Sequence, residues 1–351
     1  MLRWLKKNFS MLIVAASLVG VMIIAFSNRE MENAWESILS MDPVWVFCVF
    51  GCWAAYVLFE GLGTWLYLRN QAFPIRFGQV FSSTMIGFFY SNITPSAAGG
   101  QPMQINSLRK AGIPVGYGTS GVTVRFITNQ FTISLMSLVL FFTHQQAVYE
   151  QLTGKLWFFG LGWIINFGAV PVVLLAAFHL KWIRKMSDWI IRKMHTFHLI
   201  RYPDETRSKV WDMLETYHEA LRNLLHQPMQ IFLQLLCSLI SLLGLNGSVA
   251  FVYHAFGLSQ ISWGFLLTLS CILFISASYT PLPGASGAQE GGFLLYFNGI
   301  FTDGTIGLAL LVWRFFTYYI FLITGMFFVL GEKILHLFHK KGHTHPKKPH
   351  A

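Results

Sequence analysis

Long apolar runs separated by short polar or basic stretches dominate the chain. Six of them approach or exceed the roughly 20 residues that a bilayer requires, namely about 9–27, 44–66, 113–142, 157–180, 229–256 and 305–331. Two further apolar runs, 77–94 and 261–280, each end at a Thr-Pro pair. The pattern predicts an all-α polytopic membrane protein with about six full transmembrane helices and two broken helical hairpins. The run 9–27 also fits a cleaved signal peptide, but we favour a retained anchor helix.

The two Thr-Pro breaks are similar in sequence. Thr94 opens TPSAAGGQP, and Thr280 opens TPLPGASGAQE, 186 residues later (280 − 94). Matched residues recur in order around them, while the offset grows from 186 to 188 and then 189. The matches are Glu60-Gly61 with Asn246-Gly247, Gly78 with Gly264, Phe88 with Phe274, Gly99 with Gly287, Gln101 with Gln289, and Arg125-Phe126-x-Thr128 with Arg314-Phe315-x-Thr317. The chain therefore contains two repeat halves, about 44–142 and 229–331.

The basic residues predict the orientation of these segments. They cluster in 3–7, 69–76, 109–110, 181–209 and from residue 333 onward. Cytoplasmic loops of membrane proteins carry such clusters. Every cluster lies inside only if 77–94 and 261–280 each enter the membrane, turn at the Thr-Pro pair and leave on the same side. We therefore predict two re-entrant hairpins in an inverted repeat, with tips that meet around a midplane cavity and both termini in the cytoplasm.

The composition excludes several classes of protein. The chain is 54% hydrophobic and 11% charged, whereas soluble domains average about 25% charged residues. Its net charge of +10 does not indicate nucleic-acid binding, because each basic cluster borders an apolar run. The four cysteines lie inside apolar runs and are expected to pack there rather than form disulfides or bind metal. The sequence has no nucleotide-binding loop or hydrolase motif, so we expect no cofactor and no enzyme activity.

Four charged residues lie inside or beside the apolar segments, where an unpaired charge is costly: Glu60, Arg125, Glu290 and Arg314. The repeat gives the two arginines equivalent positions beside their hairpins. Guanidinium groups bind phosphate through paired donors, which predicts an anionic headgroup site. In the alternative, the arginines pair with the two glutamates and lock the helices together. The two interpretations are compatible.

The breaks supply further candidate binding groups. Two glutamines offer amide donors, and two threonines offer hydroxyls that either cap the turns or bind a headgroup. Three glycines permit unusual backbone angles, and short helices beginning after the breaks would point their positive N-terminal ends at the cavity. Besides the four charged residues, the predicted substrate-binding set therefore contains Gln101, Gln289, Thr94, Thr280, Gly99, Gly100 and Gly287.

Two basic regions lie outside the apolar runs. The segment 181–228 interleaves lysines and arginines with Trp182, Trp189 and Trp211. It predicts one or two amphipathic helices on the cytoplasmic surface, attracted to anionic lipids; the alternative is an ordinary basic loop. The His-rich segment 333–351 is interpreted as a disordered cytoplasmic tail rather than a metal site. Residues 1–332 then form a single transmembrane domain.

The signatures TPSAAGGQP and TPLPGASGAQEGGF, with their spacing, resemble the transmembrane flippase region of lysylphosphatidylglycerol synthases, the multiple peptide resistance factors. The resemblance covers about residues 10–332. It implies translocation of aminoacylated phosphatidylglycerol, or a related anionic or glycosylated lipid, between leaflets. The full synthases carry more spans and a soluble aminoacyl-transfer domain. This sequence shows only a short basic tail there, so we do not expect lysyl-lipid synthesis, and the transported lipid stays open.

Several functions fit these observations. The first is a flippase for an anionic phospholipid or lipid-linked headgroup in the cell membrane. The alternatives are a secondary transporter of a small hydrophilic solute, a membrane-embedded lipid-modifying enzyme, and a duplicated structural protein without transport. The enzyme ranks lowest among the active functions because His144, His179 and His254 are scattered near span ends. Membrane lipids are the implied partners, with a homo-oligomer as a further option.

Overall fold

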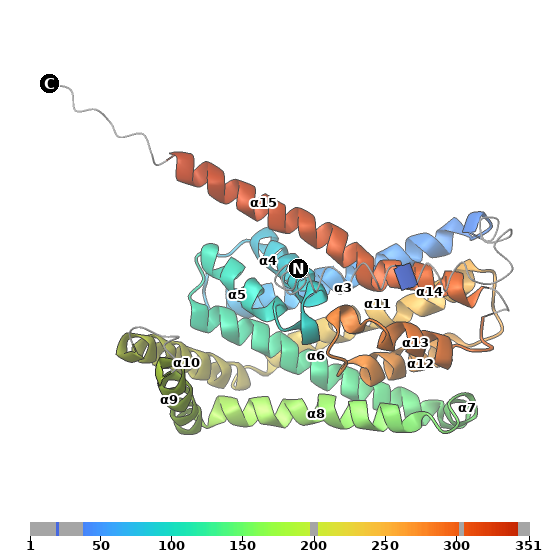
Figure 1. Ribbon diagram of the computed structural model, residues 1–351, viewed down its shortest axis with the longest axis horizontal. Helices are drawn as coiled ribbons and strands as arrows, with labels where there is room; N and C mark the ends of the chain where they lie inside the picture. The colour runs from blue at the N-terminus through green and yellow to red at the C-terminus, as the bar shows by residue number, and fades with distance from the viewer. Residues whose placement is uncertain (1–18, 21–37, 197–202, 302–304, 343–351) are drawn as a thin grey trace.

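A computed structural model describes residues 19–20, 38–196, 203–301 and 305–342 (Figure 1), and within these ranges the chain forms helices and no strands. The first repeat half contains α3 (Pro43–Asn70), α4 (Phe77–Ile93), η1 (Pro95–Ala97), α5 (Gly100–Lys110) and α6 (Val115–Thr143). The second contains α11 (Pro228–Ala255), α12 (Trp263–Ala277), η2 (Pro283–Ala285), α13 (Ala288–Tyr296), α14 (Ile306–Arg314), η3 (Phe315–Tyr319) and α15 (Ile320–Gly342). Between them lie α7 (Gln145–Gln151), α8 (Leu156–Phe178), α9 (Leu180–Thr196) and α10 (Pro203–Leu225). The two halves therefore share one order of elements.

The helices confirm a multi-pass membrane protein. Within the described ranges, four segments are long and apolar enough to cross a membrane: Pro43–Asn70, Val115–Thr143, Pro228–Ala255 and Ile306–Ile334. The predicted count of about six is not confirmed. The predicted span 9–27 lies outside the described residues except for residues 19–20, and α8 offers a shorter apolar stretch, Leu156–Gly168. The predicted disordered tail also needs correction, because α15 continues as a helix to Gly342; residues 343–351 lie outside the described part.

Both Thr-Pro breaks end a helix and turn the chain back on itself. The hairpin of α4 and α5 turns through η1, and the hairpin of α12 and α13 turns through η2. Figure 1 shows the two hairpins extending from their meeting point toward opposite ends of the bundle. The tips touch, and the amide of Ser96 donates a hydrogen bond of 3.2 Å to the carbonyl of Pro281. The two breaks thus meet in space, as their sequence similarity predicts.

The two halves interlock rather than forming separate units. Helix α4 packs on α15 of the other half, α12 packs on α6, and α3 and α11 form the most extensive helix contact of the molecule. Glycines permit the close approaches. A Cβ added at Gly244 would lie 2.7 Å from the Cys52 carbonyl oxygen, and one at Gly325 would lie 2.9 Å from that of Met85. Small residues are the usual means by which membrane helices pack closely.

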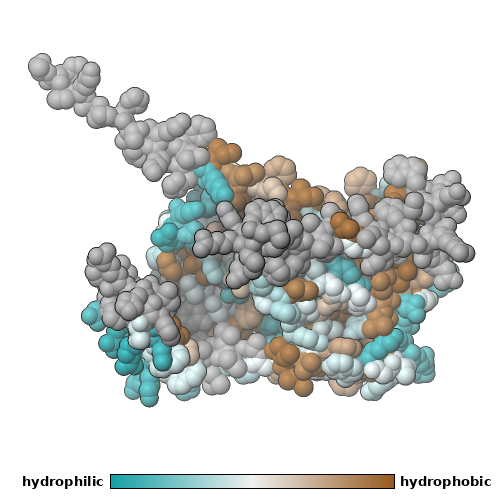
Figure 2. All heavy atoms as spheres, viewed as in Figure 1, coloured by the Kyte–Doolittle hydropathy of each residue, from teal (hydrophilic) through white to brown (hydrophobic). Residues whose placement is uncertain are grey.

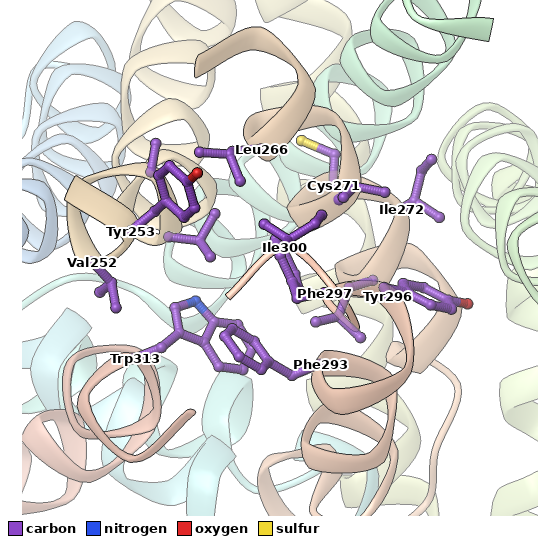
Figure 3. Packing of buried hydrophobic residues seen from close by; sticks show 14 of the residues in the cluster. Val252, Tyr253, Leu266, Cys271, Ile272, Phe293, Tyr296, Phe297, Ile300 and Trp313 are labelled. Atoms are coloured by element: carbon purple, nitrogen blue, oxygen red, sulfur yellow. The ribbon is translucent and has the colours of Figure 1, made fainter. Parts of the chain in front are cut away.

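A buried aromatic cluster fixes the second hairpin against the helix that follows it (Figure 3). Phe293 of α13 stacks on Trp313 of α14, with ring centroids 5.0 Å apart, and on Phe297 at 4.7 Å. Cys271 of α12 lies fully buried in the same cluster, as expected for a packing residue. Arg314 directly follows Trp313, so this cluster sets the position of the arginine relative to the hairpin.

Hydrophilic surface gathers at the two ends of the bundle. Figure 2 shows it around α9 and α10 at one end and around α7 at the other. The segment 181–228 does form two helices, α9 and α10, and α10 packs on α6 and α9. If the positive-inside orientation is correct, α9 and α10 are cytoplasmic and α7 is external.

Cysteine labelling checks this orientation. Gln146 and Lys185 are exposed and lie at opposite ends of the bundle. In a protein whose four native cysteines are replaced, an impermeant thiol reagent should label Gln146→Cys in intact cells. It should label Lys185→Cys only after permeabilisation. Labelling of Lys185→Cys from outside would contradict the inverted topology.

Candidate functional site

The first buried arginine joins three helices. Arg125 of α6 and Glu60 of α3 are 4% and 7% exposed, and Nη2 of Arg125 lies 2.7 Å from Oε1 of Glu60. Asn129 and Ser241 donate further hydrogen bonds to the same oxygen, at 2.8 and 3.0 Å. Because α3 has Gly63 beside the guanidinium, where a Cβ would lie 2.7 Å from Nη1, the arginine can cross this helix closely. Three side chains from α6 and α11 thus donate to one oxygen of Glu60.

The remaining contacts of Arg125 reach α11. Its Nη1 donates to the Gln234 carbonyl at 3.1 Å and to the Ser238 hydroxyl at 3.0 Å. The side chain of Gln234 donates in turn to the Gly63 carbonyl at 2.9 Å. One guanidinium therefore ties α3, α6 and α11 together, which is the locking role that the sequence left open. Gln234, Ser238 and Ser241 lie on one side of the apolar helix α11, and their spacing of four and three residues is a signal that the sequence alone contains.

The second buried arginine holds a hairpin tip. Arg314 ends α14, and its Nη2 and Nε lie 2.7 and 2.8 Å from Oε1 of Glu290. Nη2 also donates to the Gly284 carbonyl in η2 at 3.2 Å. The other oxygen of Glu290 accepts the Gly287 amide at 2.6 Å, which caps the start of α13. The guanidinium lies 4.7 Å from the centroid of the Tyr318 ring, a favourable cation–π distance.

The two arginine sites are not copies of each other. Each arginine pairs with the glutamate of its own half, but Glu60 precedes its hairpin whereas Glu290 lies within the other hairpin. The counterpart of Glu60 is Asn246, and the counterpart of Glu290, at an offset of 188, is Pro102. The backbone differs too, because Arg314 is followed by the π-helical turn η3 and Arg125 lies within regular α-helix. Such turns occur frequently at functional sites.

A cavity of about 350 Å³ lies where the two tips meet. Both halves line it, and Arg314 supplies a charge at its wall. The lining also carries amides and hydroxyls, among them Asn92, Asn246, Ser270, Ser278, Gln289 and Thr317. Aromatic rings, including those of Phe274 and Trp313, cover other parts of the wall. This mixture suits an amphiphilic ligand with one anionic group and several hydroxyls.

The predicted residues divide between this cavity and its surroundings. Arg314, Gln289 and Thr280 line the cavity, and Glu290 holds Arg314 in place. Other predicted residues, including Gln101, Glu60 and Arg125, do not belong to the lining, and Gln101 is exposed. The two arginines therefore do not share one cavity in this state.

Thr94 behaves as a capping residue. Its hydroxyl donates to the Tyr90 carbonyl at 2.6 Å and accepts the Gly99 amide at 2.9 Å. Both contacts stay within the first hairpin, so they fix the path of the chain through the break. Thr280, its counterpart, instead lines the cavity.

The predicted glycines allow the turns for two different reasons. A Cβ at Gly99 would lie 2.7 Å from the Thr94 side chain, and one at Gly100 would lie 2.9 Å from the Gly87 carbonyl oxygen and collide with Ser91. Gly287 has open space around it, so close packing does not explain it. The backbone conformation explains the glycine instead: Gly287 has φ of 86° and ψ of −50°, which residues with a Cβ avoid.

We expect Gly287→Ala to lower the free energy of unfolding by about 1–3 kcal/mol, the usual cost of a strained backbone residue. Gly291→Ala is the matched control, because Gly291 lies in α13 with no atom within 4 Å of its would-be Cβ. The melting temperature of each purified variant in detergent checks the difference. Equal melting temperatures would contradict the backbone explanation.

The backbone at the tips repeats as the sequence does. Ser96 and Ala97 have φ of 51° and 55°, and their counterparts at an offset of 188, Gly284 and Ala285, have φ of 60° and 50°. Left-handed backbone costs a non-glycine residue roughly 1–2 kcal/mol. Contacts between the tips must offset this cost, and strain of this kind gathers at functional sites.

Several lining residues were missed in the sequence. Asn246 accepts from the Ser270 hydroxyl at 3.4 Å, and Tyr318 donates to the Asn92 carbonyl at 3.1 Å, a contact between the two halves. The sequence match of Asn246-Gly247 with Glu60-Gly61 points to Asn246, although the predicted binding set does not include it. Neither Ser270 nor Asn92 had a comparable signal, because single polar residues are common in membrane helices.

Comparison with known proteins identifies the family. Residues 10–325 match the family described as the lysylphosphatidylglycerol synthase TM region. The chain belongs to this family. It is also 23% identical over 318 residues to a UPF0104 membrane protein of Archaeoglobus fulgidus. The aligned region covers 88% of this chain and 92% of the relative. The resemblance indicated by the two break signatures is thus confirmed, and the matched region includes both arginine sites.

Proposed function

We propose that this member of the lysylphosphatidylglycerol synthase TM family moves an anionic phospholipid or a lipid-linked headgroup between the leaflets of the cell membrane. The cavity between the hairpin tips carries the proposal, because it joins an arginine, amides, hydroxyls and aromatic rings in one space. The headgroup binds there, and the acyl chains remain in the bilayer. The hairpins are re-entrant, the two termini are cytoplasmic, and the protein acts by transport rather than chemistry.

Arg314 is the headgroup anchor. Its hydrogen bonds to described residues use Nε and Nη2, so Nη1 remains for a phosphate oxygen. Glu290 keeps the guanidinium in place and balances its charge, which lowers the cost of burying an arginine inside the membrane. Gln289 and Asn246 then bind hydroxyls or ester oxygens of the headgroup.

The repeat supplies a second state for transport. The sequence offsets match Asn246 with Glu60, Thr280 with Thr94, Gln289 with Gln101 and Arg314 with Arg125. If the two halves exchange their packings, the first-half residues line an equivalent cavity that opens to the other leaflet. Inverted-repeat transporters alternate access in this manner. We therefore retain these residues, with the glycines of both tips, as binding and gating residues of that second state.

Reconstitution tests the proposal. Proteoliposomes carry a fluorescent phosphatidylglycerol, and dithionite added outside bleaches only the outer leaflet. We expect the protected inner pool to decay faster than in protein-free vesicles. The matched control Glu150→Gln, at an exposed residue of α7 that does not line the cavity, should act like the unmodified protein.

Mass spectrometry of the lipids that copurify with the protein identifies further headgroups, which are then tested in the same assay. If every copurified anionic lipid crosses only at the protein-free rate, the proposal fails. Uptake of a soluble polar solute without lipid movement would instead favour the secondary transporter.

A further inference from the structure

Helix α9 is attached to the rest of the protein by one side. Asp188 accepts hydrogen bonds from Arg207 and Trp211 of α10, at 3.0 and 3.1 Å, and Arg184 pairs with Glu215. Ile191 is 6% exposed. These contacts hold α9 against α10 and define its inner face.

The opposite side of α9 carries a stripe of large apolar residues. Trp182, Met186, Trp189 and Ile190 are exposed by 61%, 42%, 57% and 41%. Their spacings of four, three and one residues place them along one side of a helix. A water-facing helix does not usually gather four such residues, so the stripe indicates an apolar environment.

A row of cations borders this stripe. Lys181, Lys185 and Arg192 are exposed and separated by four and seven residues, so they align along the helix. The ion pairs described for α9 use Arg184 and Asp188 instead. The row therefore presents positive charge beside the apolar stripe, which is the pattern of a helix lying in the surface of an anionic membrane.

The position of α9 agrees with this pattern. The helix follows α8 after a single residue, His179, and Figure 1 shows it turning away from the axis of α8 to lie across the end of the bundle. The membrane-spanning helices run along that axis. A helix across their end lies along the membrane surface, near the headgroups.

We propose that α9 is an interfacial helix of the bilayer that holds the protein. Its stripe of Trp182, Met186, Trp189 and Ile190 inserts between headgroups and acyl chains, and the row of Lys181, Lys185 and Arg192 binds anionic phospholipids. This role does not depend on transport by the cavity.

One tryptophan of α10 does not extend the apolar stripe of α9. Trp211, which the sequence grouped with the other tryptophans, is enclosed by the guanidinium groups of Arg184 and Arg207. These lie 5.0 and 4.5 Å from the Trp211 ring centroid. The Trp211 ring therefore packs within the contact between α9 and α10 rather than in the apolar stripe.

Spin labels test the insertion. In the full chain without native cysteines, labels are attached to Met186→Cys, Ile190→Cys or the control Asp212→Cys, which lies on the exposed side of α10. The proteins are reconstituted in vesicles of phosphatidylcholine and phosphatidylglycerol. Collision rates with oxygen, which concentrates in lipid, and with a water-soluble nickel chelate are then compared. We expect the ratio of oxygen to nickel collisions at 186 and 190 to be several-fold higher than at 212.

The charged row has its own test. The triple substitution Lys181→Gln, Lys185→Gln and Arg192→Gln should lower the ratio at position 186, as should vesicles of phosphatidylcholine alone. Equal ratios at 186, 190 and 212 would show that the stripe faces water and overturn the proposal. Low collision rates with both reagents would show that protein covers the stripe, and would overturn it as well.

Discussion

Arg314→Gln should slow translocation of a fluorescent anionic lipid by about 10- to 100-fold, because hydrogen bonds to charged groups contribute about 1.5–3 kcal/mol. The substitution removes the proposed phosphate donor at the cavity wall and the guanidinium that pairs with the buried carboxylate of Glu290. The dithionite assay in proteoliposomes measures the rate. The double variant Arg314→Gln and Glu290→Gln separates the two effects, since it removes the buried charge as well.

We expect the double variant to melt at a higher temperature than Arg314→Gln alone, close to that of the unmodified protein. We expect its rate of lipid translocation to stay as low as that of Arg314→Gln. Arg314→Lys should be intermediate, because lysine keeps the charge and loses the planar fork that binds phosphate through two donors. Normal transport by the double variant would show that the pair only holds α13 and α14 together.

The sequence predicted the frame of the fold through features that repeat along the chain. Length and hydropathy gave the long helices, and the matched Thr-Pro breaks gave two hairpins whose tips meet. The interlocking of the halves was not predictable. It depends on close approaches at Gly244 and Gly325, and a single glycine in an apolar run does not reveal which helix it faces.

The candidate site was predictable in kind but not in arrangement. A charge inside a membrane requires a partner, so Glu60, Arg125, Glu290 and Arg314 were identifiable from their positions in or beside the apolar runs. Which glutamate pairs with which arginine was not predictable, because Glu60 and Glu290 occupy unrelated positions in the repeat. The repeat itself suggested one shared site for both arginines. The cavity instead includes Arg314 without Arg125, since one conformation of an inverted repeat need not be symmetric.

Arg125→Gln should lower the free energy of unfolding by about 3–5 kcal/mol, the usual cost of breaking a buried ion pair by removing one partner. Glu60 would keep its hydrogen bonds from Asn129 and Ser241 but lose the charge that balances it, and α11 would lose its contacts with the guanidinium. Thermal unfolding in detergent checks this effect.

Adding Glu60→Gln to Arg125→Gln should restore much of this stability, because a neutral amide is less costly to bury than an unpaired carboxylate. Transport then decides between the two roles of Arg125. If it lines the second-state cavity, the stable double variant still moves lipid slowly, since the equivalent of Arg314 is missing on one side of the transport cycle. If the double variant regains both stability and the full rate of transport, Arg125 and Glu60 serve only to lock α3, α6 and α11, and the proposed second-state site loses its anchor.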